Sequence, residues 1–141
     1  MSEFDLAVAL SGAWRLDRRV SGQADMRGTA VFTPDGADLR YLESGQMVLR
    51  NGQTLEFSRR YVYRFHPGRM EVFFDEPVLR LFQSVELLGD SAQVTGQGFH
   101  NCPPDVYASN YRFSLPTGFS ITHRVDSPRK SYDIQTEFTR V

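Results

Sequence analysis

Turn-forming residues punctuate this sequence about every 8–12 residues, and this spacing constrains the fold more than any other feature. The segments between them alternate apolar and polar residues, a period of two that is typical of strands with one buried face. We expect about ten such strands. The turn signals are Ser21-Gly22, Pro34-Asp35-Gly36, Ser44-Gly45, Asn51-Gly52, His66-Pro67-Gly68, Glu76-Pro77, Gly89-Asp90, Pro103-Pro104, Pro116-Thr117-Gly118 and Ser127-Pro128.

Long consecutive strands joined by tight turns predict an up-and-down meander, which removes its exposed edges by closing into a barrel. The chain has 141 residues and shows no linker or repeat, so we expect one domain over residues 1–141. We therefore predict an all-β protein, an antiparallel up-and-down barrel of about 8–10 strands with a short N-terminal helix. A two-sheet sandwich is the alternative.

The N-terminal segment is the best helix candidate in the sequence. Ser2 is a suitable N-cap with Asp5 three residues later, and Gly12 can end the helix. Phe4, Ala7 and Val8 fall on one face. Because so short a helix is marginal alone, we expect it to plug one end of the barrel.

Charge and cysteine content narrow the classes of partner. The 16 basic and 17 acidic residues give a formal net charge of −1 without a basic stripe, so we expect no nucleic-acid partner. No apolar run reaches the roughly 18 residues of a membrane helix, and the acidic start lacks a signal peptide's basic region, so we expect no membrane partner. The single cysteine, Cys102, favours a reducing, cytoplasmic location. We expect neither a metal nor a cofactor.

Alternation places an unusual set of polar side chains on the inner face of the barrel. All six tyrosines fall there: Tyr41, Tyr61, Tyr63, Tyr107, Tyr111 and Tyr132. So do Arg59, Glu43, Asp105, His123 and Lys130. A dry core selects against polar groups that lack partners, so the pattern predicts a wet or ligand-filled cavity.

These residues form the predicted ligand site. Arg59 is expected to anchor an anionic group because its planar fork grips a carboxylate or phosphate. The six tyrosines are expected to form the walls, while Asp105, His123 and Lys130 supply further polar contacts. In the structural alternative, Arg59 pairs with Glu43 or Asp105 and the tyrosine hydroxyls close a buried network. Lys130 is then an exposed lysine at the rim.

Three functional hypotheses follow. In the first, the barrel binds a small anionic or aromatic ligand. In the second, it is a cofactor-independent enzyme acting on a phenolic or other small carboxylic acid, with Glu43 or His123 in acid–base catalysis; a carboxyl among tyrosines is then expected to have a raised pKa. In the third, it is a structural or interaction module, used through its rim or as a homodimer, with its inner polar residues fully paired.

Cys102 and the histidines admit plainer interpretations. One cysteine beside His100 cannot complete a tetrahedral zinc site, and a cysteine nucleophile needs a positioned base. We expect Cys102 to be a small buried side chain at a strand start. His66 is expected in a solvated turn. Three roles are open for His123: a general base, a haem ligand, or a core histidine that is hydrogen-bonded to a tyrosine or carboxylate.

Gly12-Ala13-Trp14 resembles the Gly-X-Trp signature of lipocalins and related calycins. This resemblance implies that Trp14 packs across the closed end of a barrel against an arginine from a late strand. Arg140 has the right face and position, and Arg124 is the weaker candidate.

The chain is also similar, over nearly its full length, to a bacterial family of uncharacterised small proteins known only as a domain of unknown function. The similarity rests on Gly12-Ala13-Trp14 with Arg18, Tyr41-Leu42-Glu43-Ser44-Gly45, Arg59-Arg60-Tyr61, Val72-Phe73-Phe74-Asp75, Cys102-Pro103-Pro104-Asp105-Val106-Tyr107 and Pro128-Arg129-Lys130-Ser131-Tyr132. Two features depart from it: Arg80-Leu81-Phe82 replaces an expected Phe-His pair, and Ser127 an expected glycine. The resemblance implies a lipocalin-like barrel and no known activity.

Overall fold

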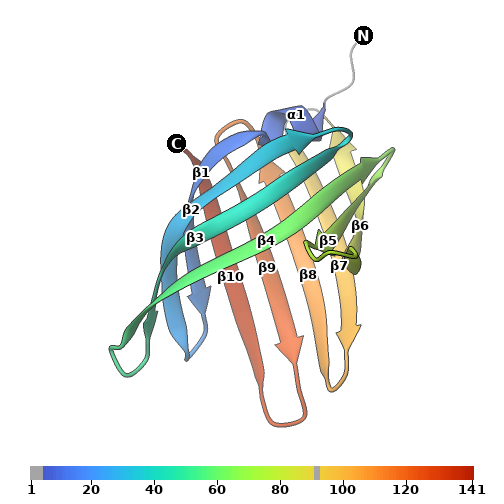
Figure 1. Cartoon of the computed structure of the whole chain (residues 1–141). Helices are drawn as coiled ribbons and strands as arrows, with labels where there is room; N and C mark the ends of the chain where they lie inside the picture. The colour runs from blue at the N-terminus through green and yellow to red at the C-terminus, as the bar shows by residue number, and fades with distance from the viewer. Residues whose placement is uncertain (1–4, 91–92) are drawn as a thin grey trace.

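The computed structural model describes residues 5–90 and 93–141, which form one closed antiparallel barrel (Figure 1). Each strand pairs with its neighbours in the sequence, and β1 pairs with β10 from Trp14↔Arg140 to Val20↔Ile134. The predicted barrel is therefore confirmed, and the sandwich alternative is wrong because no sheet edge remains. The elements are α1 (Leu6–Leu10), β1 (Gly12–Val20), β2 (Ala24–Asp35), β3 (Asp38–Leu49), β4 (Thr54–His66), β5 (Arg69–Phe74), β6 (Arg80–Asp90), β7 (Gln93–Cys102), β8 (Asp105–Ser114), β9 (Gly118–Asp126) and β10 (Ser131–Arg140).

The alternation of the sequence sets the faces of most strands. In β3, Leu39, Tyr41 and Glu43 are buried inside the barrel while the residues between them are exposed. Ser44-Gly45 was expected to be a turn, but it lies within β3, where Gly45 pairs with Gly28 of β2. A Cβ on either glycine would lie 2.0 Å from a backbone oxygen of the opposite strand. Gly45 therefore marks a close approach of two strands rather than a turn.

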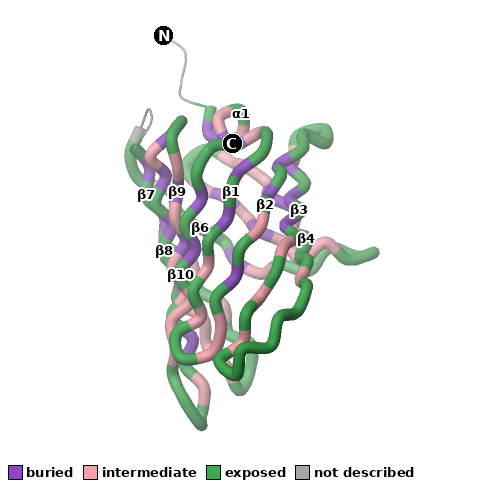
Figure 2. Tube along the Cα trace, turned by 90° about the vertical axis from the view of Figure 1, so that its left-hand side faces the viewer, coloured by how far each residue is buried: buried purple, intermediate pink, exposed green. Residues whose placement is uncertain are grey.

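The apolar core lies toward the end of the barrel that α1 covers, whereas the turns at the opposite end are exposed (Figure 2). Phe119 and Phe138 stack with their ring centroids 4.1 Å apart. Trp14 meets Phe119 edge-on at 4.9 Å. Large aromatic rings bury much apolar area in such arrangements, so this closed end supplies a large part of the hydrophobic stabilisation.

The helix α1 closes this end, as predicted, but with other residues than expected. Leu6 and Leu10 are buried in the core, and Asp5 caps the helix by accepting a hydrogen bond from the Val8 amide at 3.2 Å. Val8 is 69% exposed, so its assignment to the apolar face was wrong. Ser2 and Phe4 lie outside the described residues. In the part of the chain that the structure describes, no helix has the length and apolar character to cross a membrane.

Trp14 and Arg140 fasten α1 to the barrel. The Arg140 guanidinium lies 3.8 Å from the centre of the Trp14 ring and donates hydrogen bonds to the Ser11 and Ala9 carbonyls at 3.0 and 2.6 Å. The Trp14 indole donates to the Leu10 carbonyl at 2.9 Å. Gly12 permits this turn because its φ is +110° and a Cβ would crowd Arg140. The contact implied for Arg140 is therefore present.

Candidate functional site

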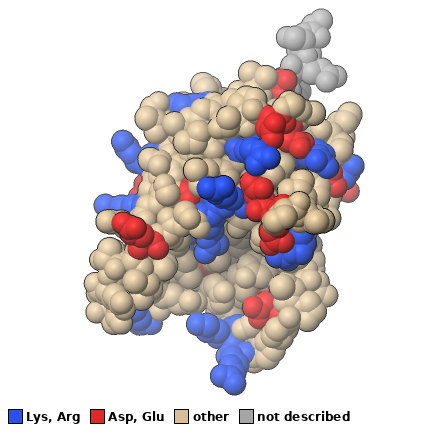
Figure 3. All heavy atoms as spheres, viewed as in Figure 1, with Lys and Arg blue, Asp and Glu red and all other residues tan. Residues whose placement is uncertain are grey.

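The candidate site is the inner face of the barrel at the end opposite α1, called the mouth below. Its residues are Arg59, Tyr61, Phe82, His100, Tyr107 and His123. In Figure 1 this is the lower end of the barrel, where β1, β3, β7 and β9 finish. Figure 3 shows the surface hollowed below β4, over the inner side of β8 to β10. The mouth thus exposes to solvent an inner face that is sealed at the other end.

Phe82 lies at the centre of an aromatic cluster in the mouth. Its ring centroid is 5.0 Å from that of His100 and about 6.0 Å from those of Tyr107 and His123, and Tyr61 lies at 6.1 Å. The register of β5 and β6 shifts here, so that Leu81 faces Phe73 while Gln83 faces Val72. This irregularity lets Phe82 and Gln83, although adjacent, both contact inner residues. Simple alternation therefore could not place this pair.

A buried ion pair forms the floor of the mouth. Both oxygens of Glu43 on β3 accept hydrogen bonds from Arg18 on β1, at 2.6 and 2.8 Å, and Oε1 also accepts one from the Tyr41 hydroxyl at 2.6 Å. Arg18 Nε donates to Thr136 at 2.8 Å. Arg18 can reach across β2 because Gly28 and Ala30 carry little or no side chain on that face. The structural alternative paired Arg59 with Glu43 or Asp105, but Arg18 is the partner of Glu43, and no ion pair of Arg59 is present among the described residues.

The environment of Glu43 also corrects its expected pKa. Burial alone would raise the pKa of this carboxyl, but the hydrogen bonds and charge of Arg18, helped by Tyr41 and Arg59, hold it below its usual range. Glu43 is therefore ionised at neutral pH, and its oxygens are occupied. A residue in this state is poorly suited to exchange protons with a ligand.

A second buried network joins β6, β8 and β9. Tyr111 donates to Gln83 Oε1 at 2.6 Å, and Gln83 Nε2 donates to the Ser109 hydroxyl at 2.5 Å. The same hydroxyl lies 2.5 Å from Nδ1 of His123. Burial, followed by the charges of Arg18 and Arg59, lowers the pKa of His123 to about 4. His123 is consequently a neutral imidazole at physiological pH.

Several polar groups on the inner face have no hydrogen-bond partner in the described part of the chain. They include the Tyr63 hydroxyl, Nε2 of His123 and the Arg59 guanidinium, besides the phenols of half-buried Tyr61 and Tyr107. Within residues 5–90 and 93–141, every fully buried side-chain nitrogen or oxygen has a hydrogen-bond partner. The Tyr63 hydroxyl, on a side chain that is only 4% exposed, must therefore border space that a small molecule or water can enter. Nε2 of His123 borders such space by the same argument.

Arg59 is a cation on this inner face without an ion-pair partner among the described residues. It lies opposite Glu43 in the β3–β4 register, and its side chain is exposed. Its charge nevertheless favours a lower pKa at Glu43, His123 and Tyr107, on three other strands, although burial leaves the pKa of Tyr107 raised. Its guanidinium therefore acts on the mouth rather than on the outer surface.

The other predicted site residues spread from the core to the rim. Tyr41, Tyr63 and Tyr111 are buried, whereas Tyr61, Tyr107, Tyr132 and Asp105 are half-buried. Lys130 is exposed in the turn before β10, with its ammonium 5.5 Å from the centre of the Tyr132 ring. This matches the rim alternative for Lys130. The structure brings Tyr61, Tyr107 and His123 together around Phe82 but leaves Lys130 outside that cluster.

Cys102 and His66 do not lie where the sequence predicted them. Cys102 was expected to be buried at a strand start, but it is exposed at the end of β7. His66 was expected in a solvated turn, yet it ends β4 and pairs with Glu71. Hydrogen bonding by His66 is the main reason why the pKa of Glu71 is lowered.

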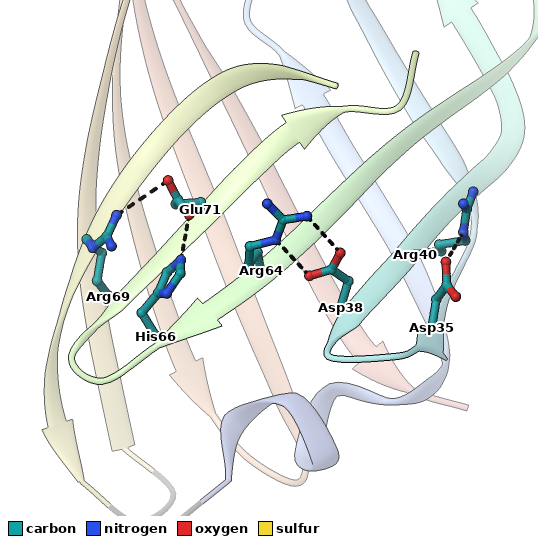
Figure 4. A network of polar contacts seen from close by, with 7 residues as sticks. All are labelled: Asp35, Asp38, Arg40, Arg64, His66, Arg69 and Glu71. Atoms are coloured by element: carbon teal, nitrogen blue, oxygen red, sulfur yellow. Dashed lines mark hydrogen bonds and ion pairs between the residues drawn. The ribbon is translucent and has the colours of Figure 1, made fainter. Parts of the chain in front are cut away.

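The outer surface of β2 to β5 carries a row of ion pairs that is separate from the mouth (Figure 4). Arg40 pairs with Asp35 and Arg64 with Asp38, while Glu71 bridges His66 and Arg69. Such exposed pairs are screened by solvent and salt, so they add little stability. Their charges are already matched, which leaves no free cation or anion in this row to recruit a ligand.

The outer face of β6 to β10 also holds an open groove of about 740 Å³. Small polar side chains line it, among them Thr95, Gln97, Asn110, Ser120 and Thr122. These side chains alternate with inner residues along their strands. The sheet therefore separates the groove from the mouth. It lacks the aromatic cluster that distinguishes the mouth.

Comparisons with known proteins agree with this architecture. Rv2717c from M. tuberculosis has a similar fold, with a TM-score of 0.66 and 15% identity, and the match covers 98% of this chain and 99% of that one. A redesigned β-barrel aligns with a TM-score of 0.50 and 14% identity, covering 100% and 99%. At these identities the likeness shows the fold alone. No match was found among curated proteins.

A family model settles the relationship that the sequence motifs implied. It matches residues 10–140, a span that runs from the last residue of α1 to the last residue of β10. The match thus includes Trp14 and Arg140 at the closed end together with Arg18, Glu43, Arg59 and His123 at the other. The chain belongs to DUF6314, a family of unknown function.

Proposed function

We propose that this protein binds a small, planar, anionic ligand in the mouth of its barrel. The observation that carries the proposal is that two inner polar groups, the Tyr63 hydroxyl and Nε2 of His123, lack a protein partner in the described chain, near the exposed and unpaired Arg59 guanidinium. Unpaired polar groups inside a protein cost free energy unless water or a ligand satisfies them. These groups share their surroundings with aromatic rings, which favours a ligand with a flat apolar body.

The charge balance of the mouth supports an anion. Arg18 is neutralised by Glu43, whereas Arg59 has no carboxylate within ion-pair distance in the described chain. The Arg59 guanidinium therefore remains available to an anion near neutral His123. A guanidinium suits a carboxylate, sulfonate or phosphate because it can donate two parallel hydrogen bonds.

The competing hypotheses receive less support from the site. Catalysis by Glu43 on a phenolic acid requires a carboxyl with a raised pKa, and Arg18 produces the opposite shift. A purely structural barrel should pair its inner polar groups, as Arg18, Glu43 and Gln83 do, but Tyr63 departs from that rule. A homodimer remains a separate prediction, which light scattering can test.

A titration with the fluorescent anion 8-anilinonaphthalene-1-sulfonate, hereafter the naphthalene sulfonate probe, tests the proposal. The probe is aromatic and anionic, and its emission rises in apolar surroundings. Arg59→Ala should weaken binding about tenfold or more, since a charged hydrogen bond contributes roughly 1.5–3 kcal/mol. Arg60→Ala is the matched control: it removes the same charge from the adjacent residue, which is exposed on the outer face.

Both variants should keep the circular dichroism spectrum and urea midpoint of the unmodified protein. Equal affinities of the two variants would show that Arg59 is not the anchor. Lack of any binding by the unmodified protein would count against the mouth as a site for aromatic anions.

A further inference from the structure

The hydrogen bonds in the network behind His123 all run from donor to acceptor in one order. That order decides whether the ring nitrogen that faces the mouth, Nε2, carries a proton. The members of the network are Tyr111, Gln83, Ser109 and His123, joined in that order by hydrogen bonds of 2.6, 2.5 and 2.5 Å. Such a chain can run in two senses, because amide and hydroxyl groups both donate and accept. In one sense Nδ1 of His123 accepts from Ser109, and in the other it donates to Ser109.

Tyr111 selects the first sense because it ends the chain in the apolar interior. Its side chain is 3% exposed, and burial raises the pKa of its phenol, so the hydroxyl keeps its proton. Gln83 Oε1 is the acceptor available to that proton in the described structure. Reversing the amide would make Tyr111 an acceptor and leave its proton unpaired, at a cost of roughly a lost buried hydrogen bond.

The remaining protons follow from this choice. With its oxygen facing Tyr111, the Gln83 amide must donate through Nε2 to the Ser109 hydroxyl. In the described structure, the acceptor that remains for the Ser109 proton is Nδ1 of His123. A neutral imidazole carries a proton on one nitrogen, so when Nδ1 accepts, Nε2 holds it.

The charged groups around His123 keep it neutral. Burial and the facing cations Arg18 on β1 and Arg59 on β4 disfavour an imidazolium, and Glu43 on β3 opposes them weakly because Arg18 neutralises it. The remaining neighbours are Ser109, the ring of Phe82 and the phenol of Tyr107. Burial is also the main reason why the pKa of Tyr107 is raised, so its phenol stays uncharged.

We propose that His123 acts as a neutral hydrogen-bond donor whose Nε2–H binds an acceptor oxygen of the ligand. The inference rests on the proposed function for the ligand itself, while the direction of the network does not depend on that function. It narrows the ligand class to planar anions that carry an acceptor oxygen, such as a carbonyl, phenolate or carboxylate, within the aromatic cluster. It also means that His123 offers no lone pair to a metal ion in this state, because Nε2 is protonated.

The tautomer can be measured directly on the full chain without a ligand. The protein has three histidines, so selective ¹⁵N labelling gives a simple spectrum in which His123→Gln identifies the signals of interest. At pH 7 we expect a protonated Nε2 and a bare Nδ1. A bare Nε2, an imidazolium or an equal mixture of tautomers would overturn the inference.

Variants then test whether the network fixes this tautomer. Ser109→Ala should produce a mixture of tautomers, because Nδ1 loses its donor, whereas Ser84→Ala on the exposed face of β6 should change nothing. If Ser109→Ala does not fold, Tyr111→Phe removes the terminal donor instead and should also yield a mixture. An unchanged tautomer in the folded variant would show that the network does not set the direction.

The naphthalene sulfonate probe separates this inference from the proposed function. Its sulfonate oxygens are acceptors, so Ser109→Ala should weaken its binding in proportion to the Nε2–H tautomer that is lost, about twofold for an equal mixture. Equal affinity of Ser109→Ala and the unmodified protein would refute the donor role while leaving the site intact. A protonated Nε2 in a protein that does not bind the probe would confirm the network's direction and reject the proposed function.

Discussion

The two ends of the barrel use similar residue types for different purposes. At the closed end, Arg140 lies on Trp14 and its donors are taken up by the carbonyls of α1. At the mouth, Arg59 is near enough to Tyr107 and His123 to act on their pKa values, and it has no carboxylate or carbonyl partner in the described chain. The comparison teaches that pairing, rather than polarity, separates a structural arginine from one that is free to bind a ligand.

The aromatic rings show the same contrast. Phe119 and Phe138 stack in the core and are buried, whereas the rings around Phe82 are half-buried. Burial makes the first group a source of stability, and exposure leaves the second group within reach of another flat molecule. We therefore expect substitutions at the closed end to change stability and substitutions at the mouth to change binding.

Replacing Trp14 should have the largest effect on stability. Trp14→Ala removes a fully buried ring, the indole hydrogen bond to α1 and the surface on which Arg140 rests, so we expect a loss of about 3–5 kcal/mol in urea unfolding. Tyr107→Ala, which truncates a half-buried ring in the mouth, is the comparison and should cost about 1 kcal/mol or less. Equal losses would contradict the division of roles between the two ends.

Breaking the ion pair at the floor of the mouth should cause the next largest loss of stability. Arg18→Met leaves Glu43 buried with only Tyr41 as a partner, and breaking a buried ion pair from one side costs about 3 kcal/mol or more. The double variant Arg18→Met with Glu43→Leu should recover most of that loss, because no unpaired charge remains. A double variant as unstable as Arg18→Met would show that Glu43 is not the source of the penalty.

A smaller effect is expected from pH. His123 binds its proton with a pKa of about 4 when folded and near 6.5 when unfolded, so the unfolded chain takes up more protons as the pH falls through this window. Stability should therefore fall on acidification, by roughly 1–2 kcal/mol between pH 6.5 and 5. The lowered pKa of Glu43 acts in the same direction but only below its unfolded value of about 4.5.

Urea unfolding of the unmodified protein and His123→Gln at several pH values isolates this contribution. The variant should show a weaker dependence between pH 6.5 and 5. An identical dependence in both proteins would mean that another group is responsible for it.

Features that follow the period-two alternation of the strands could be predicted from the sequence, and irregular features could not. The barrel and the inner position of the tyrosines follow from alternation, and the Trp14–Arg140 contact follows from the resemblance to calycins. The Arg18–Glu43 pair was not predicted because it spans an intervening strand. A usable signal was present in Gly28 and Ala30, whose small size opens the path between them.

Irregular features account for the remaining differences. Gln83 was missed because the shifted register of β5 and β6 interrupts the alternation that assigns faces. Gly45 was taken for a turn because a glycine between strand-like segments has the same sequence signature as a close approach of two strands. The direction of the His123 network depends on which group ends it, and that becomes visible only when Tyr111, Gln83 and Ser109 are brought together.

Mapping the naphthalene sulfonate probe onto the protein by NMR tests the central claim most directly. We predict that backbone amide shifts change most around Arg59, Phe82, Tyr107 and His123, and little in α1 or along the outer groove of β6 to β10. Shifts that centre on Thr95, Gln97 and Asn110 in that groove, or shifts spread evenly over the surface, would contradict the claim that the mouth is the ligand site.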